Sequence, residues 1–273
     1  MNRFKNTGVC RAGAEIRVSS VNLHYGEEPP ISGKRGSGTI FLSHCNLRCL
    51  YCQNFPISQQ GVGNKYSINE LVEAMLSLQN RSAHNINLVA PSHYAVQLHR
   101  AVIIARERGL TIPIVYNSSG YDSPEQLELW NGHIEIYMPD LRYWDNDSAE
   151  KYSGANDYPE ISRNAVKIMH SQVGDLVMDE NGIAQKGVLI RLLVLPQKIS
   201  GTVQTLRWIA ENLGTNVYLS VMSQYFPAYK AHDEPPLDRQ IFAGEYIEVL
   251  ETLDDLGFER GYIQPVPSGD EDG

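Results

Sequence analysis

The sequence predicts an α/β fold whose central sheet is built from parallel strands. Short β-type runs alternate with helical patterns along most of the chain, and a strand, helix and strand in succession form a right-handed parallel crossover. The runs are apolar on both faces, as buried parallel strands are. Six strands are expected, at residues 38–43, 86–90, 112–117, 134–138, 188–195 and 217–221. An open doubly wound sheet and a full or partial barrel share this periodicity, which does not choose between them.

Start and stop signals mark the helices between these strands. Ser67 and Glu70 have the spacing of a capping box ahead of apolar residues at helical intervals. Ser123 followed by Pro124 predicts a second helix start, because proline is favoured in the first turn. Further helices are expected near 160–173, from 203 to 213 before Gly214, and over 239–256 before Gly257.

The chain of 273 residues fits one domain, since single α/β domains of this length are common. Residues 1–37 are rich in glycine and proline and are expected to form an irregular N-terminal extension. Residues 38–265 contain the alternating pattern and form the predicted core. The acidic end, 266–273, is expected to be a solvated tail.

Composition narrows the classes of function. Hydrophobic residues make up 42% of the chain, enough for a sizeable core, and the net charge is −9. A negative surface repels phosphate groups, which argues against general nucleic-acid binding and against a polybasic membrane anchor. No apolar run approaches the roughly 20 residues that span a bilayer, and the first residues lack an apolar signal segment. A cytoplasmic location is therefore expected.

Three of the four cysteines lie within eight residues, directly after the first expected strand. Cys45, Cys49 and Cys52 have the spacing C-x3-C-x2-C. Three thiolates bind three irons of a [4Fe–4S] cluster and leave one iron open, whereas electron-carrying clusters normally use four cysteines. A structural zinc site is the alternative, with His44 or Cys10 as a fourth ligand. The carboxyl end of a parallel strand is also where α/β folds place their chemistry.

The cysteine segment, with Tyr51 as its aromatic residue, is similar to the signature of the radical S-adenosylmethionine (SAM) superfamily. Further segments resemble the pyruvate formate-lyase activating enzyme-like branch, including its uncharacterised iron–sulfur members; these segments are Gly36-Ser-Gly-Thr-Ile-Phe, Tyr51-Cys-Gln-Asn54, Met138-Pro-Asp-Leu-Arg-Tyr-Trp144 and Arg191-Leu-Leu-Val-Leu-Pro196. The resemblance runs through nearly the whole chain and implies a partial (β/α)6 barrel. It also implies two cofactors, a [4Fe–4S] cluster and S-adenosyl-L-methionine. The implied activity is of oxidoreductase type: an electron from the reduced cluster cleaves SAM, and the resulting 5′-deoxyadenosyl radical abstracts hydrogen from a substrate.

The resemblance also suggests which residues hold SAM. Arg191 lies on the fifth strand, where the family uses an arginine that can grip the SAM carboxylate with two hydrogen bonds. Asp140 and Asn117 follow the fourth and third strands, and Tyr51 and Asn54 belong to the cysteine segment. Alternatives remain open for each: a salt bridge between Arg191 and Asp140, a loop-capping role for Asp140, and a plain turn at Asn117.

Two departures from the family pattern affect the functional prediction. After the second strand, where many relatives carry Gly-Gly-Glu-Pro, this chain has Val89-Ala90-Pro91-Ser92. Ser92 or His93 could replace the missing contact to SAM, backbone carbonyl groups could serve instead, and a cap of the following helix is the alternative role for Ser92. The sequence also lacks the N-terminal cysteine cluster that precedes Cys10 in similar proteins, and Cys10 is expected to have no role at the cluster.

The partners implied by the resemblance are a glycyl-radical enzyme, which this chain would activate, and an electron donor such as flavodoxin or ferredoxin. Two alternatives are a radical SAM enzyme that acts on a small molecule and a non-enzymatic, metal-stabilised interaction module.

Overall fold

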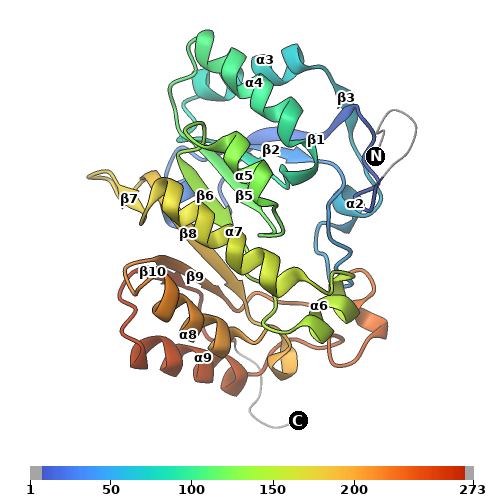
Figure 1. Ribbon diagram of the computed structural model, residues 1–273, viewed down its shortest axis with the longest axis vertical. Helices are drawn as coiled ribbons and strands as arrows, with labels where there is room; N and C mark the ends of the chain where they lie inside the picture. The colour runs from blue at the N-terminus through green and yellow to red at the C-terminus, as the bar shows by residue number, and fades with distance from the viewer. Residues whose placement is uncertain (1–7, 268–273) are drawn as a thin grey trace.

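The computed structural model describes residues 8–267 of the chain. A sheet of ten strands forms its centre, in the order β10-β9-β8-β6-β5-β4-β2-β1-β3, with β7 paired to β8 (Figure 1). The strands are β1 (Ile16–His24), β2 (Ser37–Leu42), β3 (Asn64–Tyr66), β4 (Ile86–Val89), β5 (Ile114–Ser118), β6 (Ile136–Pro139), β7 (Val177–Met178), β8 (Ala184–Leu193), β9 (Tyr218–Met222) and β10 (Gly261–Ile263).

Six of these strands correspond to the six that the sequence predicts. In the sheet, these strands lie side by side in the order β2, β4, β5, β6, β8 and β9, and each strand is parallel to its neighbour in this series. The carboxyl ends of these strands therefore all lie at one edge of the sheet. The predicted α/β class with a mostly parallel sheet is confirmed, whereas the partial (β/α)6 barrel remains a prediction.

The helices are α1 (Pro29–Ser32), α2 (Phe55–Ser58), α3 (Ile68–Asn80), α4 (Ala95–Glu107), α5 (Pro124–Trp130), α6 (Asn146–Ser153), α7 (Tyr158–Val173), α8 (Thr202–Asn212) and α9 (Ala243–Asp255). The two predicted start signals are confirmed. The Ser67 hydroxyl and the Glu70 carboxylate each accept the other residue's backbone N–H, and the Ser123 hydroxyl accepts from the amide of Gln126.

Helix α9 begins four residues later than expected, at Ala243. The reason lies in Glu245, whose carboxylate accepts the amide of Phe242 at 2.8 Å and two hydrogen bonds from the Arg239 guanidinium at 2.9 Å. The first of these bonds satisfies the backbone N–H of Phe242 at the helix start, and the other two hold Arg239 against the same carboxylate. The segment from 239 to 242 is therefore a cap rather than the first helical turn.

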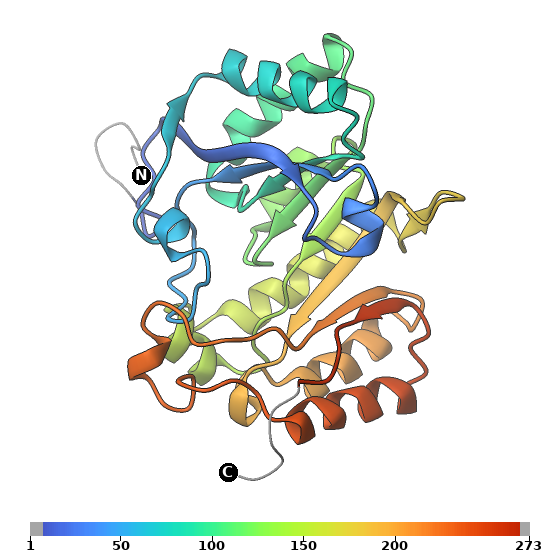
Figure 2. The same cartoon turned by 180° about the vertical axis from the view of Figure 1, so that it is seen from behind.

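The prediction of an irregular N-terminal extension is wrong for much of residues 8–37. β1 pairs antiparallel with β2 along most of its length and extends the sheet, and α1 follows it. Pro29 and Pro30, which indicated a loop, form the first turn of α1, and the glycines of residues 8–37 lie outside β1 and α1. In the view from behind, the blue segment with β1 and α1 lies in front of the central strands (Figure 2). Residues 1–7 and most of the predicted acidic tail lie outside the described residues.

The two faces of the sheet are covered differently. Long helices pack on the outer face, for example α7 against β6 and β8. On the opposite face, here called the inner face, Ile31 of α1 is fully buried and covers the amino ends of the strands. It belongs to a small apolar cluster that includes Val115, Ile136, Met138, Leu189 and Tyr218. Apolar burial therefore seals one end of the inner face, and the other end is left for polar side chains.

Candidate functional site

The three cysteines lie on the loop that follows β2, as the sequence predicts. Backbone hydrogen bonds fasten this loop to three other elements: the Ser43 amide donates to the carbonyl oxygen of Arg17 in β1, the His44 amide to that of Ile57 in α2, and the Arg48 amide to that of Ser153 in α6, each at 2.9 Å. These anchors come from distant parts of the sequence, so the tertiary fold fixes the path of the loop.

Each thiol has a polar neighbour. The Leu47 amide donates to Cys45 Sγ at 3.4 Å, and the Ser153 hydroxyl donates to Cys49 Sγ at 3.0 Å. Cys52 Sγ and the Ser58 hydroxyl are 3.0 Å apart. Burial raises the pKa of Cys45 to about 12, with the neighbouring Cys49 and Cys52 adding to the shift, and burial also raises the pKa of Cys49. The folded chain therefore favours the protonated thiol at Cys45 and at Cys49.

The donor chemistry of this loop fits an iron–sulfur cluster, because it offers three soft sulfur ligands and no carboxylate. Within residues 8–267, however, no three His, Cys, Asp or Glu side chains are gathered closely enough to hold a metal ion. Cluster binding would therefore require the thiols to deprotonate and turn toward a common centre. Metal sites of this kind form together with their metal.

A cavity of about 320 Å³ adjoins the cysteine loop. Cys45 and Cys52 line it on one side, and Asn117, Asp140 and Arg191 line it from the ends of β5, β6 and β8. The structure therefore brings together residues that the sequence places up to 146 positions apart. Cys49 lies beside this cavity but is buried among apolar neighbours.

Arg191 is the centre of an ion network inside the cavity. Its guanidinium donates to Asp140 Oδ1 at 2.8 Å, to Asn117 Oδ1 at 2.7 Å and to Glu27 Oε2 at 3.3 Å. Arg142 pairs with the other oxygen of Asp140. The salt bridge between Arg191 and Asp140 that the sequence left as an alternative is present. It leaves the proposed grip on a SAM carboxylate untested, because a ligand would have to share or displace these contacts.

The predicted residues of the cysteine segment divide into two groups. Asn54 lines the cavity, at the start of α2. The Tyr51 ring instead packs edge-on against Tyr143 and Tyr225, with ring centroids 6.4 and 5.9 Å away, and it is almost fully buried. Tyr51 therefore anchors the cysteine loop by packing its ring against Tyr143 and Tyr225. Its expected cofactor contact stays a prediction.

The turn after β4, where the sequence has Val89-Ala90-Pro91-Ser92, contains a strained backbone conformation. Ala90 lines the cavity and has a positive φ of 57°, a conformation that glycine adopts at no steric cost. Alanine is strained in this conformation, because its Cβ crowds the neighbouring backbone. Ser92 and His93 do not take over a cavity contact, because the His93 ring bonds the Ser43 carbonyl oxygen at 2.8 Å and the Ser92 carbonyl oxygen accepts from Gln126.

Sequence reasoning missed the contribution of the N-terminal segment to the cavity. His24, Gly26 and Glu27 all line it, although they lie in a stretch that was expected to be irregular and outside the core. Burial raises the pKa of Glu27, which the nearby Arg191 partly offsets. Two acidic residues in a Gly- and Pro-rich stretch are typical of a solvated loop, so the sequence held no signal of this burial.

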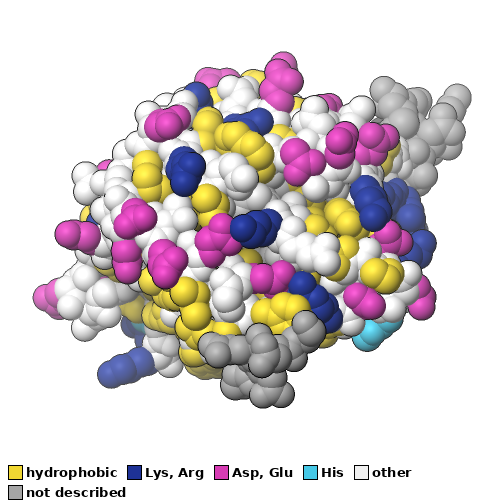
Figure 3. All heavy atoms as spheres, turned by 90° about the horizontal axis from the view of Figure 1, so that it is seen from below, with side chains coloured by type: hydrophobic (Ala, Val, Ile, Leu, Met, Phe, Trp, Pro, Cys, Tyr) yellow, Lys and Arg dark blue, Asp and Glu magenta, His cyan; other side chains and the backbone are white. Residues whose placement is uncertain are grey.

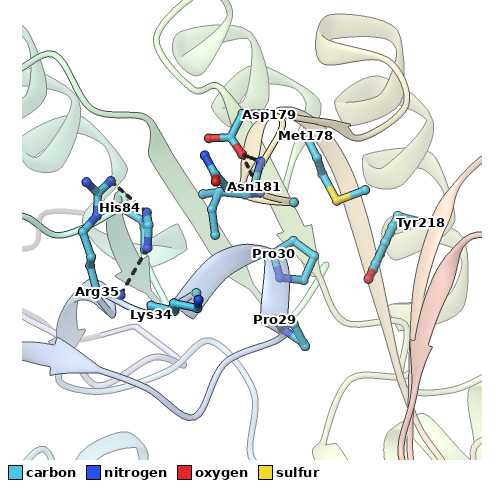
Figure 4. Close-up of a pocket in the computed structure, with 12 residues that line it drawn as sticks. Pro29, Pro30, Lys34, Arg35, His84, Met178, Asp179, Asn181 and Tyr218 are labelled. Atoms are coloured by element: carbon cyan, nitrogen blue, oxygen red, sulfur yellow. Dashed lines mark hydrogen bonds between the residues drawn. The ribbon is translucent and has the colours of Figure 1, made fainter.

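A second and larger cavity, of about 720 Å³, lies away from the cysteines. It is formed between α1 and the β7–β8 hairpin, where His84, Arg35 and Asp179 surround it together with Pro30 and Tyr218 (Figure 4). The His84 ring accepts the Arg35 amide at 3.2 Å. No cysteine borders this space, so its size does not make it the candidate site.

The charged side chains on the surface are mostly acidic on the face shown in Figure 3, in agreement with the net charge of −9. Seen from below, acidic side chains are spread over the visible face, whereas basic side chains stand singly or in small groups (Figure 3). Among the helices of the described residues, none is both long and apolar enough to cross a bilayer. The cytoplasmic location remains a prediction.

Comparison with known proteins places the chain near two archaeal sequences and one enzyme fold. No family model matches the chain. It is 29% identical to the uncharacterized protein MJ0674 of Methanocaldococcus jannaschii over 96% of this chain and 74% of the relative. With a second uncharacterized protein of that organism, MJ0808, it shares 24% identity over 97% and 75% of the two chains.

Among solved structures, the chain is similar to HydG, a maturase of the [FeFe]-hydrogenase. One crystal structure of HydG gives a TM-score of 0.51 at 13% identity, covering 81% of this chain, and HydG from Carboxydothermus hydrogenoformans gives 0.53 at 14% identity, covering 82%. These likenesses establish a shared fold. The chain spans about half the length of the HydG structures, 48% and 52%.

Proposed function

We propose that this chain is a radical SAM enzyme whose Cys45, Cys49 and Cys52 hold a [4Fe–4S] cluster with one open iron. The observation that carries the proposal is the placement of three thiols on one anchored loop beside a charged cavity. Cys10, the one other cysteine of the sequence, is buried and does not line that cavity. The fold shared with the HydG maturases supports the radical SAM superfamily.

When bound, the reduced cluster and SAM together supply a 5′-deoxyadenosyl radical for hydrogen abstraction. The contribution of the chain is to position SAM and to exclude water. The network of Arg191, Asp140 and Asn117 offers a guanidinium for a carboxylate and oxygen acceptors for amino or hydroxyl groups. Because these groups already hold one another, the charges are pre-organised before a ligand arrives.

Two classes of substrate are proposed, each with a different support. A glycine residue of a partner glycyl-radical enzyme is supported by the resemblance to the activating-enzyme branch, and a flavodoxin or ferredoxin would then donate the electron. A small molecule is supported by the cavity itself, because its buried charged groups suit a compact polar ligand. Co-purification with a glycyl-radical protein would favour the first class.

The proposal is tested by anaerobic reconstitution with iron and sulfide, followed by dithionite reduction and an assay for 5′-deoxyadenosine. We expect about four irons per chain, a reduced-cluster signal in electron paramagnetic resonance and 5′-deoxyadenosine that depends on SAM. A colourless protein with stoichiometric zinc and no iron would overturn the proposal and support a metal-stabilised interaction module.

A further inference from the structure

Two adjacent carboxylates are buried between β1 and α1. The side chain of Glu27 is 9% exposed and Glu28 is 6% exposed, which is unusual for glutamate because burying a charge is costly unless it is paired. They precede the turn whose Ile31 seals the amino end of the inner sheet face. We call Glu27 and Glu28 the acidic floor.

A branch of about 100 Å³ adjoins the acidic floor. Arg191 lines it together with the floor, and Met222 and Tyr262 enclose it from β9 and β10. The branch shares Glu27 and Arg191 with the main cavity, so the two spaces border the same charged groups. Cys45 and Cys52 line the main cavity, whereas no cysteine lines the branch.

The arginine side chains near the acidic floor already have hydrogen-bond partners. Arg191 is shared among Asp140, Asn117 and Glu27, and Arg142 pairs with Asp140. The two guanidinium groups therefore pair with Asp140 and Glu27, and no ion pair to Glu28 is formed among these contacts. Arg260 and Glu28 both interact electrostatically with Tyr218. The Arg260 guanidinium, however, donates its hydrogen bonds to the carbonyl oxygens of Asn216 and Leu176.

One oxygen of the acidic floor lacks a donor. Glu28 Oε2 is buried and has no hydrogen-bond partner among the described residues, although a buried carboxylate oxygen normally accepts one. Glu27 has an amide donor, Asn87 Nδ2 at 3.0 Å, besides Arg191. Burial still raises the pKa of Glu27, so an added cation would stabilise the ionised form of Glu27.

We infer that the acidic floor and its branch are a subsite for a cationic group, an ammonium or guanidinium, on the molecule that the proposed enzyme transforms. A compact head of a few heavy atoms fits a branch of about 100 Å³. The inference rests on the proposed function only in calling the bound molecule a substrate, because binding of a cationic group to Glu27 and Glu28 does not require the cluster. SAM also carries an ammonium group, but SAM would be held on the cysteine side, and no cysteine lines the branch.

The test uses propylamine as the cationic probe, with 1-propanol and propionate as neutral and anionic probes of similar size. Binding is measured by ligand-detected saturation-transfer NMR on the cluster-loaded protein. We expect propylamine to bind at least about tenfold more tightly than either other probe. Glu28→Gln should abolish that preference, as the loss of a charge-assisted hydrogen bond to a buried carboxylate predicts.

The control is Glu15→Gln, which changes an exposed carboxylate paired with Lys65 and should leave propylamine binding unchanged. If Glu28→Gln fails to fold, Glu28→Asp, which keeps the charge but shortens the side chain, should weaken propylamine binding while 1-propanol binding stays the same. Equal binding of propylamine and 1-propanol, or full propylamine binding to Glu28→Gln, would overturn the inference.

A competition experiment separates the two sources of an ammonium group. If the subsite serves the substrate, propylamine and SAM bind together, and saturating propylamine leaves the affinity for SAM unchanged. Mutual exclusion would show that the acidic floor holds SAM itself and would overturn the substrate assignment. Cys49→Ala, which should lack the cluster, should still bind propylamine, so failure of the radical SAM proposal and failure of this subsite give different results.

Discussion

The two sides of the cavity are prepared for ligands in opposite ways. On the cysteine side, burial keeps the thiols of Cys45 and Cys49 protonated, and their polar neighbours are a serine hydroxyl and a backbone amide. On the opposite side, Arg191 already has three oxygen partners. The comparison teaches that the cysteine side, the proposed metal site, would have to rearrange to bind a metal, whereas the contacts of the charged side are already formed.

The comparison is tested most severely by Cys49→Ala. If the cysteine side depends on its metal, loss of one thiolate should remove most of the iron, the brown chromophore and SAM cleavage altogether. Iron content, the visible spectrum and 5′-deoxyadenosine report these three properties. The folded state should persist, because the neighbouring backbone bonds of the loop do not involve the thiol. Full iron content in this variant would show that the ligand set is different.

Arg191→Ala should have the next largest effect, on the charged side. Removing one member of a buried ion network leaves Asp140 and Glu27 with less compensation, so we expect the free energy of unfolding to fall by about 3–5 kcal/mol. If Arg191 also holds the SAM carboxylate, SAM binding should weaken by roughly 1–3 kcal/mol. Urea unfolding and calorimetric titration measure the two effects.

The matched control for this variant is Arg108→Ala, which removes a guanidinium from an ion pair with Glu73 whose side chains are 45% and 63% exposed. Exposed pairs contribute about 0–1 kcal/mol. A stability loss at Arg191 no greater than at Arg108 would mean that the network is not pre-organised, and the contrast between the two sides would fail.

Glu27→Gln should have a smaller, pH-dependent effect. Burial raises the pKa of Glu27 above its ordinary 4.5 in the folded state, so the folded state favours the protonated carboxyl. This contribution to stability is fully present below the unfolded pKa and is lost as pH rises through the folded pKa. Relative to Glu27→Gln, the natural protein should therefore lose stability as pH rises above about 4.5, and urea unfolding across this range measures the difference. A relative gain would contradict the burial of an incompletely paired carboxylate.

Cys10→Ala is expected to have the smallest effect. Cys10 is buried and does not line the cavity, so the variant should keep its iron and its SAM cleavage and lose only about 1 kcal/mol of stability. It serves as the matched control for Cys49→Ala, since both substitutions remove one buried thiol. Loss of the cluster from Cys10→Ala would make Cys10 a ligand and would favour the four-ligand alternative.

The sequence by itself determined the elements that rest on local chemistry. The six parallel strands follow from short apolar runs, and the starts of α3 and α5 follow from Ser67 and Ser123, because a hydroxyl placed before a helix accepts an amide wherever the chain goes. The sequence also places the three cysteines directly after β2, although backbone hydrogen bonds to other elements fix the path of their loop.

The tertiary structure alone decided which distant residues share the cavity. Glu27 and Glu28 look like part of a solvated loop in the sequence, yet they are buried because β1 pairs with β2 and Ile31 fills the inner face behind them. The partners of Arg191 come from three other segments. Such contacts depend on the register and packing of whole elements, which local propensity does not encode. The sequence suggested the Arg191–Asp140 pair as one alternative, and only the folded chain shows that Glu27 joins it.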